Sequence, residues 1–344
     1  MAKNLGLALL IGAIGGALFH SLGLPLAWML GPMTFNMAAA VAKWPVAVPL
    51  RLRAAMQAVL GVFLGSSFSP ETVARAPEWP WSLAAIIVFV VLSTALVAWY
   101  YHKLGGFDRV TALFSATPGG MTAMILMGSA AGGDERRIAL AQALRITLVV
   151  LLIPPLVFAT STQLPAPAQL GIQGRAFDLL ELSLLVGGSL GGLFLARLIR
   201  MPAPEIAGPM FVSAGLYLAG AVQLTLPPVL LGATLWILGS SVGARFIGVN
   251  PRELLIMGRY ALGAVALALG LAALFALGIS AVLEVEFLAA LLALAPGGVA
   301  EMCLIAVAFD IDPTFVAFHH LARMLFLMIL VPLIGRLLYS PARR

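Results

Sequence analysis

Two short segments place helix-breaking residues inside apolar stretches, a combination that can bind an ion. Thr117, Pro118, Gly119 and Gly120 form the first, and Ala295, Pro296, Gly297 and Gly298 form the second. We call them the first and second PGG segments. Proline removes a backbone donor and clashes with the preceding turn, and glycine has no side chain that favours a helix. Each segment therefore predicts two half-helices whose free amides and carbonyls can hold an anion or a cation.

The polar residues around these segments are few, and several of them carry charge or protons. Thr122 follows the first segment, Glu301 follows the second, and Arg145, His320 and Arg323 lie in the apolar stretches that come next. A charged group at membrane depth is costly unless it is paired, so it is a functional candidate by default. We expect the arginines to supply counter-charge to a bound anion and Glu301 or His320 to exchange protons.

The composition places the chain in a membrane. Of its 344 residues, 62% are hydrophobic and 10% are charged, and the mean hydropathy is +1.06. A soluble fold cannot hide this much apolar surface, so we predict an all-α integral membrane protein whose partner is the lipid bilayer. The net charge of +6 includes no basic cluster of the kind that binds nucleic acid. Cys303 is the only cysteine, and the four histidines form no ligand cluster, so we predict no metal site and no cofactor.

The sequence repeats itself, with the second copy offset in the numbering by 174 to 178. Leu24–Met33 (LPLAWMLGPM) aligns with Met201–Met210 (MPAPEIAGPM), and the first PGG segment aligns with the second. Arg145 aligns with Arg323 at the offset of the PGG segments. Ordered matches of this kind indicate a tandem duplication. We therefore assign residues 1–162 to a first membrane repeat, 163–178 to a linker and 179–344 to a second membrane repeat.

Each repeat contains six apolar segments, and the loop charges indicate how they cross. If all six crossed, five arginines of the second repeat would lie outside, contrary to the positive-inside pattern. If the segment that contains the PGG motif enters and leaves on one side, each repeat crosses five times and the second is inverted. We predict this tandem inverted-topology repeat, with about 10 spans, two Pro-Gly-Gly broken or re-entrant helices and both termini in the cytoplasm. A variant in which the PGG segments span and a weak segment such as 5–22 or 53–68 does not cross stays open. The segments are 5–22, 25–42, 53–68, 80–101, 110–131, 138–160, 180–199, 204–223, 227–245, 255–278, 287–309 and 316–338.

Structural interpretations compete with the binding site. The arginines would then snorkel to headgroups or cap a loop, and each PGG segment would be a kink or a close helix contact. A repeat-related pair of PGG segments favours the binding site, because secondary transporters build their sites from paired broken helices. Asp134 and Asp312, which align in the repeat, are candidates for helix caps.

The motifs TPGGMTAM with ALRITLVVLLIPP, and APGGVAEM with LARMLFLMILVPL, resemble those of the AbrB-type membrane protein family. The resemblance covers essentially the whole chain and implies a multi-pass protein of the bacterial inner membrane. Family members are labelled regulators or ammonia monooxygenases, and they differ from the small DNA-binding protein of the same name. A monooxygenase needs a cluster of metal ligands that the sequence lacks, so we expect no enzyme activity. Loops of roughly twenty residues are too short for a DNA-binding module, so any regulation would be indirect.

The expected function is secondary transport of a small, anionic organic solute that binds at the PGG segments. The architecture is similar to that of bile-acid/sodium symporters and sodium/proton antiporters, but the sequence has no paired intramembrane Asp-Asp, and Ala123 aligns with Glu301. The alternative is a membrane sensor that binds a ligand without transport and affects gene expression indirectly. Glycine-rich stretches such as Gly12–Gly16 and Gly187–Gly192 would permit the close helix contacts of a homodimer.

Overall fold

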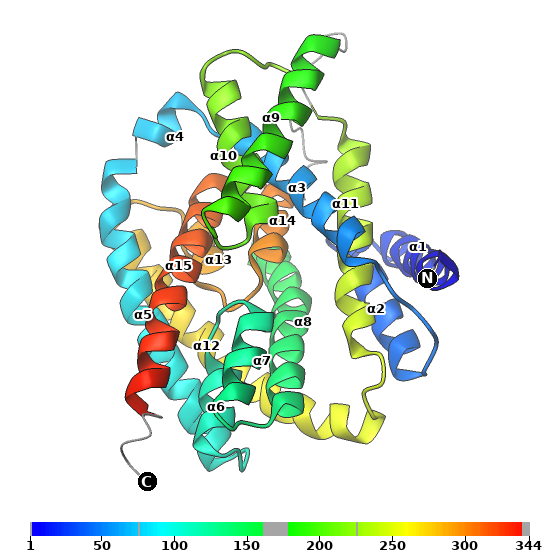
Figure 1. Cartoon of the computed structure of the whole chain (residues 1–344), viewed down its shortest axis with the longest axis vertical. Helices are drawn as coiled ribbons and strands as arrows, with labels where there is room; N and C mark the ends of the chain where they lie inside the picture. The colour runs from blue at the N-terminus through cyan, green and yellow to red at the C-terminus, as the bar shows by residue number, and fades with distance from the viewer. Residues whose placement is uncertain (1, 75, 161–177, 225, 339–344) are drawn as a thin grey trace. The chain divides into compact units, whose positions relative to one another are not determined.

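The computed structural model describes residues 2–74, 76–160, 178–224 and 226–338, and these residues form helices without a β-strand (Figure 1). The helices before residue 161 are α1 (Ala2–Ser21), α2 (Ala27–Val41), α3 (Leu50–Ser66), α4 (Pro70–Ala74), η1 (Ala76–Glu78), α5 (Trp79–Lys103), α6 (Arg109–Ala116), α7 (Met121–Ala130) and α8 (Glu135–Thr160). Those after residue 177 are α9 (Leu179–Leu198), α10 (Pro204–Leu218), α11 (Pro228–Gly243), η2 (Ala244–Phe246), α12 (Pro251–Leu283), α13 (Phe287–Leu294), α14 (Val299–Ala308) and α15 (Pro313–Leu338).

The predicted apolar segments coincide with these helices. Each of the twelve segments overlaps one α-helix, except that 110–131 overlaps α6 and α7 and 287–309 overlaps α13 and α14, and 227–245 also reaches η2 after α11. In both exceptions the helix stops before the PGG segment and a new helix starts after it. The predicted linker, 163–178, lies outside the described residues apart from Asp178, whose side chain accepts a hydrogen bond from the Leu180 amide and caps α9. The C-terminal residues 339–344, predicted to be cytoplasmic, also lie outside.

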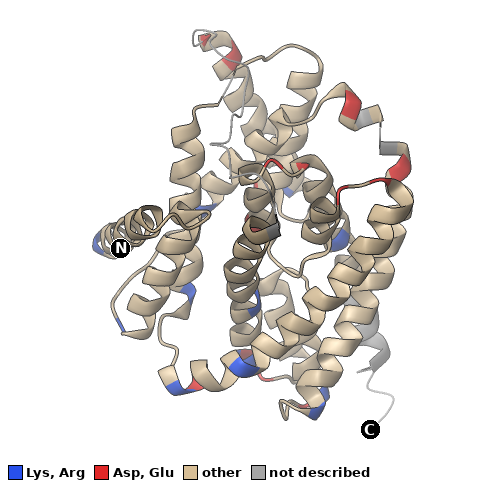
Figure 2. Ribbon diagram, turned by 180° about the vertical axis from the view of Figure 1, so that it is seen from behind, with Lys and Arg blue, Asp and Glu red and all other residues tan. Residues whose placement is uncertain are grey.

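Seven helices in the described part of the chain are long and apolar enough to cross a membrane: α1, α5, α8, α9, α11 with η2, α12 and α15. The helices α2, α3 and α10 have 15, 17 and 15 residues. At about 1.5 Å per residue they are shorter than a hydrocarbon core of about 30 Å. Figure 2 shows long ribbon stretches without charge, with most basic and acidic segments at helix ends. Large apolar side chains such as Phe194 on α9 and Trp99 on α5 are more than half exposed, as a lipid-facing surface requires.

The chain forms two compact units, and each unit draws on both predicted repeats. Unit 1 comprises Met1–Pro77, Leu151–Val249 and Val299–Ala317, and unit 2 comprises Glu78–Val150, Asn250–Gly298 and Phe318–Arg344. The boundaries of the compact units therefore differ from those of the predicted repeats. Helices α8 and α15 contribute residues to both units.

In unit 1, glycines let helix backbones touch, and each such contact occurs twice. Gly15 of α1 lies against Gly31 of α2, and Gly192 of α9 lies against Gly208 of α10. In both pairs a side chain on either glycine would collide with the backbone carbonyl of the other. The second pair repeats the first at an offset of 177 in the numbering. Any larger residue would force the helices apart, because backbone atoms cannot yield as a flexible side chain can.

A second set of glycine contacts in unit 1 joins a helix of one half to a helix of the other. Gly61 of α3 packs on the backbone of Ile206 in α10, and Gly239 of α11 packs on the backbone of Met29 in α2. The two glycines are related by an offset of 178 and their partners by an offset of 177, so the contact is reciprocal. This register differs by one helical turn from the offset of 174 that relates the LGSS sequences in α3 and α11.

The unusual backbone conformations also recur. Eleven of the described residues have positive φ, and ten of them form pairs at an offset of 177 or 178. The pairs are Gly23 with Arg200, Leu26 with Ala203, Lys43 with Gly220, Gly106 with Glu284, and Gly132 with Asp310. In every pair at least one member is not glycine, although the left-handed region is costly for residues with a Cβ. Helix ends are thus held in the same conformation in both halves even where the sequence does not favour it.

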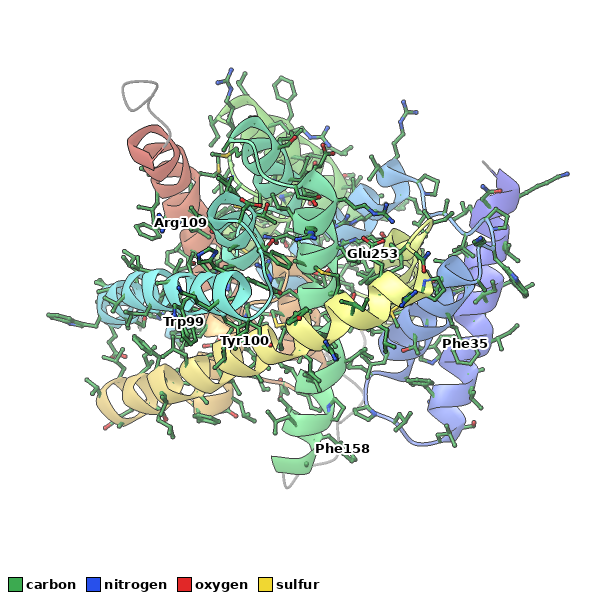
Figure 3. The ribbon with its side chains drawn as sticks, turned by 90° about the horizontal axis from the view of Figure 1, so that it is seen from below. Phe35, Trp99, Tyr100, Arg109, Phe158 and Glu253 are labelled. Carbon is green, nitrogen blue, oxygen red and sulfur yellow. The ribbon has the colours of Figure 1, made fainter. Side chains whose placement is uncertain are left out.

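In unit 2, α12 runs along α5 and contacts α13, while α6 packs on α5 (Figures 1 and 3). Tyr100 of α5, labelled in Figure 3, lies against Gly263 of α12, where a Cβ would collide with the tyrosine hydroxyl. Asp134 accepts a hydrogen bond from the Arg137 amide at 3.0 Å and caps the start of α8. The predicted cap at Asp312 is also confirmed, because its side chain accepts bonds from the amides of Thr314 and Phe315 in unit 1.

Candidate functional site

The first PGG segment is a short extended link between two helices of unit 2. Asp108 begins α6 by accepting a hydrogen bond from the Thr111 amide at 2.9 Å. At the other end Thr117 leaves the helix with φ −65° and ψ 121°, and Gly120 precedes α7 in a similar extended conformation. Gly120 is the N-cap residue of α7 and has no side chain that could accept a hydrogen bond from the first amides of that helix. Thr117 is buried, whereas Thr122, in the first turn of α7, is exposed.

Side chains from α8 hold the carbonyls where α6 ends. Gln142 donates through Nε2 to the carbonyls of Phe114 at 2.7 Å and Thr117 at 3.0 Å. Arg145 donates through Nη1 to the same Thr117 carbonyl at 3.0 Å. Together with the Gly119 amide, three donors converge on one oxygen. The positive arginine thus stands at a helix C-terminus, where the partial charge is negative.

This first site keeps unused hydrogen-bonding capacity. Gln142 Oε1, Arg145 Nε and the Ser115 hydroxyl are buried and have no hydrogen-bond partner among the described residues. Such groups cost free energy unless a ligand or water satisfies them. Arg145 forms no ion pair with any described carboxylate. The donors among these groups, Arg145 Nε and the Ser115 hydroxyl, suit an anion, whereas Gln142 Oε1 can only accept a hydrogen bond from a ligand.

The second PGG segment is held by α15 in the same unit. Arg323 donates through Nη1 to the Ala295 carbonyl at 2.7 Å and through Nη2 to the Gly297 carbonyl at 3.1 Å. His320 Nε2 lies 2.9 Å from the Leu292 carbonyl, and its Nδ1 lies 2.8 Å from Arg323 Nη2. A carbonyl can only accept and a guanidinium can only donate, so His320 is neutral with its proton on Nε2. In this arrangement neither ring nitrogen is free to bind a further proton.

The two arrangements match residue by residue at an offset of 178. Gln142 binds the Phe114 carbonyl as His320 binds that of Leu292. Arg145 Nη1 binds the Thr117 carbonyl as Arg323 Nη1 binds that of Ala295. The sequence indicated that the arginines align but not that each one fastens the end of a short helix. These bonds correspond to the structural interpretation in which the arginines cap a loop, although sequence could not indicate which carbonyls they bind.

Helix α15 also reaches the first PGG segment. A side chain on Gly120 would stand 3.8 Å from the terminal methyl of Met324, the residue next to Arg323. The helix that holds the second PGG segment therefore contacts the first. Helix α15 thus lies next to both segments, with Arg323 at the second and Met324 at the first.

A cavity of about 190 Å³ lies beside the first PGG segment, within unit 2. Thr117 lines it together with apolar residues of α5, α6 and α15. Thr94 of α5 also lines the cavity, and its buried hydroxyl has no hydrogen-bond partner among the described residues. An apolar cavity with a few unsatisfied polar groups is the usual form of a small-molecule site.

Glu301 belongs to unit 1 and has a partner that the sequence analysis did not name. Its carboxylate lies 3.9 Å from the guanidinium of Arg245, and both side chains are largely buried, with 6% and 13% of their area exposed. Arg53 of α3 adds a second positive charge near Arg245. Arg245, at the end of the apolar segment 227–245, is one of the five second-repeat arginines that the positive-inside pattern placed in the cytoplasm. Only its position directly after α11 could have indicated burial. The remaining predicted site residues, Pro118, Pro296, Gly119 and Gly298, lie in the two links, and both prolines are buried.

Comparison with known proteins gives the same family for the whole chain. The family model described as "Transition state regulatory protein AbrB" matches residues 4–339. The "Uncharacterized protein YhjN" of Bacillus subtilis (strain 168) is 26% identical over 96% of this chain and 91% of its own length. The "Putative regulator AbrB" of Escherichia coli (strain K12) is 26% identical over 94% of each chain. The chain therefore belongs to the AbrB family.

Proposed function

We propose that this protein is a secondary transporter of a small, anionic organic solute in the bacterial inner membrane. The observation that carries the proposal is the pair of PGG segments, each fastened by a buried arginine with the same hydrogen bond from Nη1 to a carbonyl. Paired helix interruptions near one another are the usual substrate site of such transporters. The many apolar helices agree with a membrane protein, and the inner membrane is part of the proposal.

The proposal includes an inverted duplication with about 10 crossings and two re-entrant helices. Its support is the recurrence of glycine contacts and positive φ angles at offsets of 177 and 178. In unit 1, Thr234 Oγ1 lies 3.9 Å from Met56 Sδ, and these two residues are themselves related by the offset of 178. A residue that touches its own repeat equivalent lies on a twofold axis, as in a symmetric dimer interface. A twofold relation within one chain supports a duplication, and the support for its inversion is the distribution of charges in the loops.

The preference for an anion follows from the charges around the first PGG segment. Arg145 is 7% exposed and has no carboxylate partner among the described residues. The N-terminus of α7 adds amides with a partial positive charge. Thr94 and Thr117 line the cavity and would orient the solute, and Arg145 supplies positive charge behind Thr117, to whose carbonyl it donates. The apolar lining of the cavity suits an organic acid better than an inorganic ion.

Transport of organic acids tests the proposal directly. The purified protein is reconstituted into liposomes that contain a pH-sensitive dye, and a panel of mono-, di- and tricarboxylates is applied under pH and sodium gradients. We expect at least one to enter, and Arg145→Ala and Arg323→Ala to lower its rate by about tenfold or more. Arg109→Ala, an exposed arginine on α6, is the matched control and should transport normally. Binding of a carboxylate without flux would overturn the transporter.

We assign proton coupling to Glu301, since both nitrogens of His320 are already engaged. Glu301 is buried and pairs with Arg245 only at the long distance of 3.9 Å, so protonation would release an already weak contact. Glu301→Gln should therefore abolish uphill movement driven by a pH gradient while downhill exchange of solute continues. An equal loss of both modes would assign Glu301 a structural role.

The second candidate is a membrane sensor that binds the same class of ligand and acts on gene expression indirectly. Its support is the name of the Escherichia coli relative, "Putative regulator AbrB". The three donors on the Thr117 carbonyl hold the first PGG segment in place. A segment held in this way agrees with a sensor that binds a ligand without transporting it. Neither proposal includes enzyme activity, a cofactor or contact with nucleic acid, and a homodimer stays a prediction.

A further inference from the structure

A second cavity, of about 390 Å³, lies in unit 2 apart from the PGG segments. It opens between the start of α12, the start of α8 and the link from α5 to α6. Its volume corresponds to roughly a dozen water molecules, so it has room for a hydrated phosphate with part of a larger molecule. Nothing in the transport proposal uses this cavity.

The cavity carries a surplus of positive charge. Three arginines line it, Arg136, Arg137 and Arg252, against one lining carboxylate, Glu253. Arg136 pairs with Glu253, which is labelled in Figure 3, and Arg137 pairs with Asp134 at 3.4 Å. Arg252 forms no ion pair with the described residues. A guanidinium in such a cluster suits a phosphate oxygen, because its N–H groups match the geometry of phosphate.

The surroundings of the cavity indicate which phosphate it takes. The cavity lies at the first turns of α12, a helix long and apolar enough to span a membrane. Ile256 lines the cavity and is 47% exposed, and Leu255 next to it is 73% exposed. A phospholipid presents both of the groups that this mixed surface can bind, a charged headgroup and an apolar chain. Basic pockets at helix ends on the cytoplasmic side are suited to anionic headgroups.

We propose that this cavity is a binding site for the headgroup of an anionic phospholipid. Arg252 and Arg137 contact the phosphate, and the apolar side chains beside them contact the acyl chains. Arg137 is already oriented by its stacking over the ring of Phe107, at 5.5 Å from guanidinium carbon to ring centre. The site would hold the link between α5 and α6 against the start of α12, all within unit 2.

The test titrates the full-length protein in detergent with three probes: short-chain phosphatidylglycerol, short-chain phosphatidylcholine and inorganic phosphate. Native mass spectrometry counts the bound lipid. We expect saturable binding of phosphatidylglycerol and little binding of phosphatidylcholine. The double variant Arg137→Gln/Arg252→Gln should weaken the phosphatidylglycerol affinity by roughly 10- to 30-fold, since each arginine near a membrane surface contributes to anion binding.

The control removes the same charge elsewhere. Lys103→Gln/Arg109→Gln changes two exposed residues that do not line the cavity, and Figure 3 shows Arg109 apart from Glu253. This variant should bind phosphatidylglycerol as the unmodified protein does. Equal losses in both double variants would overturn the site, because the effect would then be one of net charge. Inorganic phosphate that displaces phosphatidylglycerol at similar concentration would assign the cavity to a soluble phosphate instead of a lipid.

Discussion

The two PGG segments are held by equivalent residues but differ in how completely their polar groups are satisfied. At the second segment Arg323 binds two carbonyls and a histidine nitrogen, and both nitrogens of His320 are engaged. At the first, Arg145 binds one carbonyl through Nη1, and the Gln142 oxygen and the Ser115 hydroxyl are buried without partners among the described residues. Both segments are thus fastened, but the first keeps more capacity for a further ligand.

Burial of the following helices shows the same contrast. Every residue of α14 from Val299 to Val307 is buried, but in α7 only Met124 and Gly128 are. A helix with few buried contacts can shift at a lower cost in free energy than one inside a core. We infer that the second segment forms a rigid half-site and the first an adaptable half-site. The cavity of about 190 Å³ lies beside the adaptable one.

The largest expected effect comes from removing the arginines. Arg323→Ala leaves the carbonyls of Ala295 and Gly297 and the Nδ1 of His320 without this donor, so it should lower the free energy of unfolding by about 3 kcal/mol or more. Arg145→Ala should cost only about 1 kcal/mol, because Gln142 and the Gly119 amide still serve the Thr117 carbonyl. Unfolding in detergent against denaturant measures both.

The control for this pair is Arg109→Ala, which removes an exposed arginine of α6 and should change stability by less than about 0.5 kcal/mol. If Arg145→Ala proved as costly as Arg323→Ala, the two segments would be equally fastened. The distinction between a rigid and an adaptable half-site would then fail.

Much of the local structure could be predicted from the sequence. The helices fall where apolar segments of the right length occur, and helices end at both PGG segments because proline and glycine cannot continue them. Alignment of the halves also singled out Arg145 and Arg323. These features depend on residue type and spacing over a few turns, which the sequence records directly.

The long-range contacts could not be predicted in the same way. The reciprocal packing of α3 on α10 and of α11 on α2 depends on tertiary arrangement, and the LGSS match indicated a register one turn away from the observed glycine contacts. The Arg245–Glu301 pair joins residues that are distant in the chain, and the charge rule treated Arg245 as a loop residue. A charged residue beside an apolar helix can set the orientation of that helix in the membrane, or it can pair with another charge. The spacing of residues in the sequence does not distinguish these two roles.

Gln142 and His320 occupy equivalent positions at the two segments, so exchanging them tests how differently the segments are held. His320→Gln should cost less than about 1 kcal/mol, since glutamine offers a donor for Leu292 and an acceptor for Arg323. Gln142→His should cost more, about 1 to 1.5 kcal/mol, because one imidazole N–H cannot serve the carbonyls of both Phe114 and Thr117. The same denaturant series measures both variants. A larger loss for His320→Gln would mean that the histidine has a role beyond fastening the segment.

The smallest expected effect concerns the start of α6. Asp108 caps this helix, whereas its counterpart Glu286 makes no side-chain cap hydrogen bond to α13. Partial burial raises the pKa of Asp108, but hydrogen bonds from Thr111 and from the amides of Thr111 and Val110 outweigh it, so its pKa is lowered from 3.8. A lowered folded pKa means that the ionised cap stabilises the protein above the unfolded pKa and that this stability is lost as the pH falls through the folded value.

Asp108→Asn keeps a capping oxygen but cannot titrate, so it isolates this contribution. Between neutral pH and about pH 3, the unmodified protein should lose slightly more stability than Asp108→Asn, by a few tenths of a kcal/mol up to about 1 kcal/mol at an exposed helix N-terminus. Thermal unfolding midpoints of the two proteins across this range measure the difference. Parallel curves would show that the cap acts through its shape alone. The first PGG segment would then owe nothing to charge at the start of α6, and its adaptability would rest on the unsatisfied groups of Gln142 and Ser115.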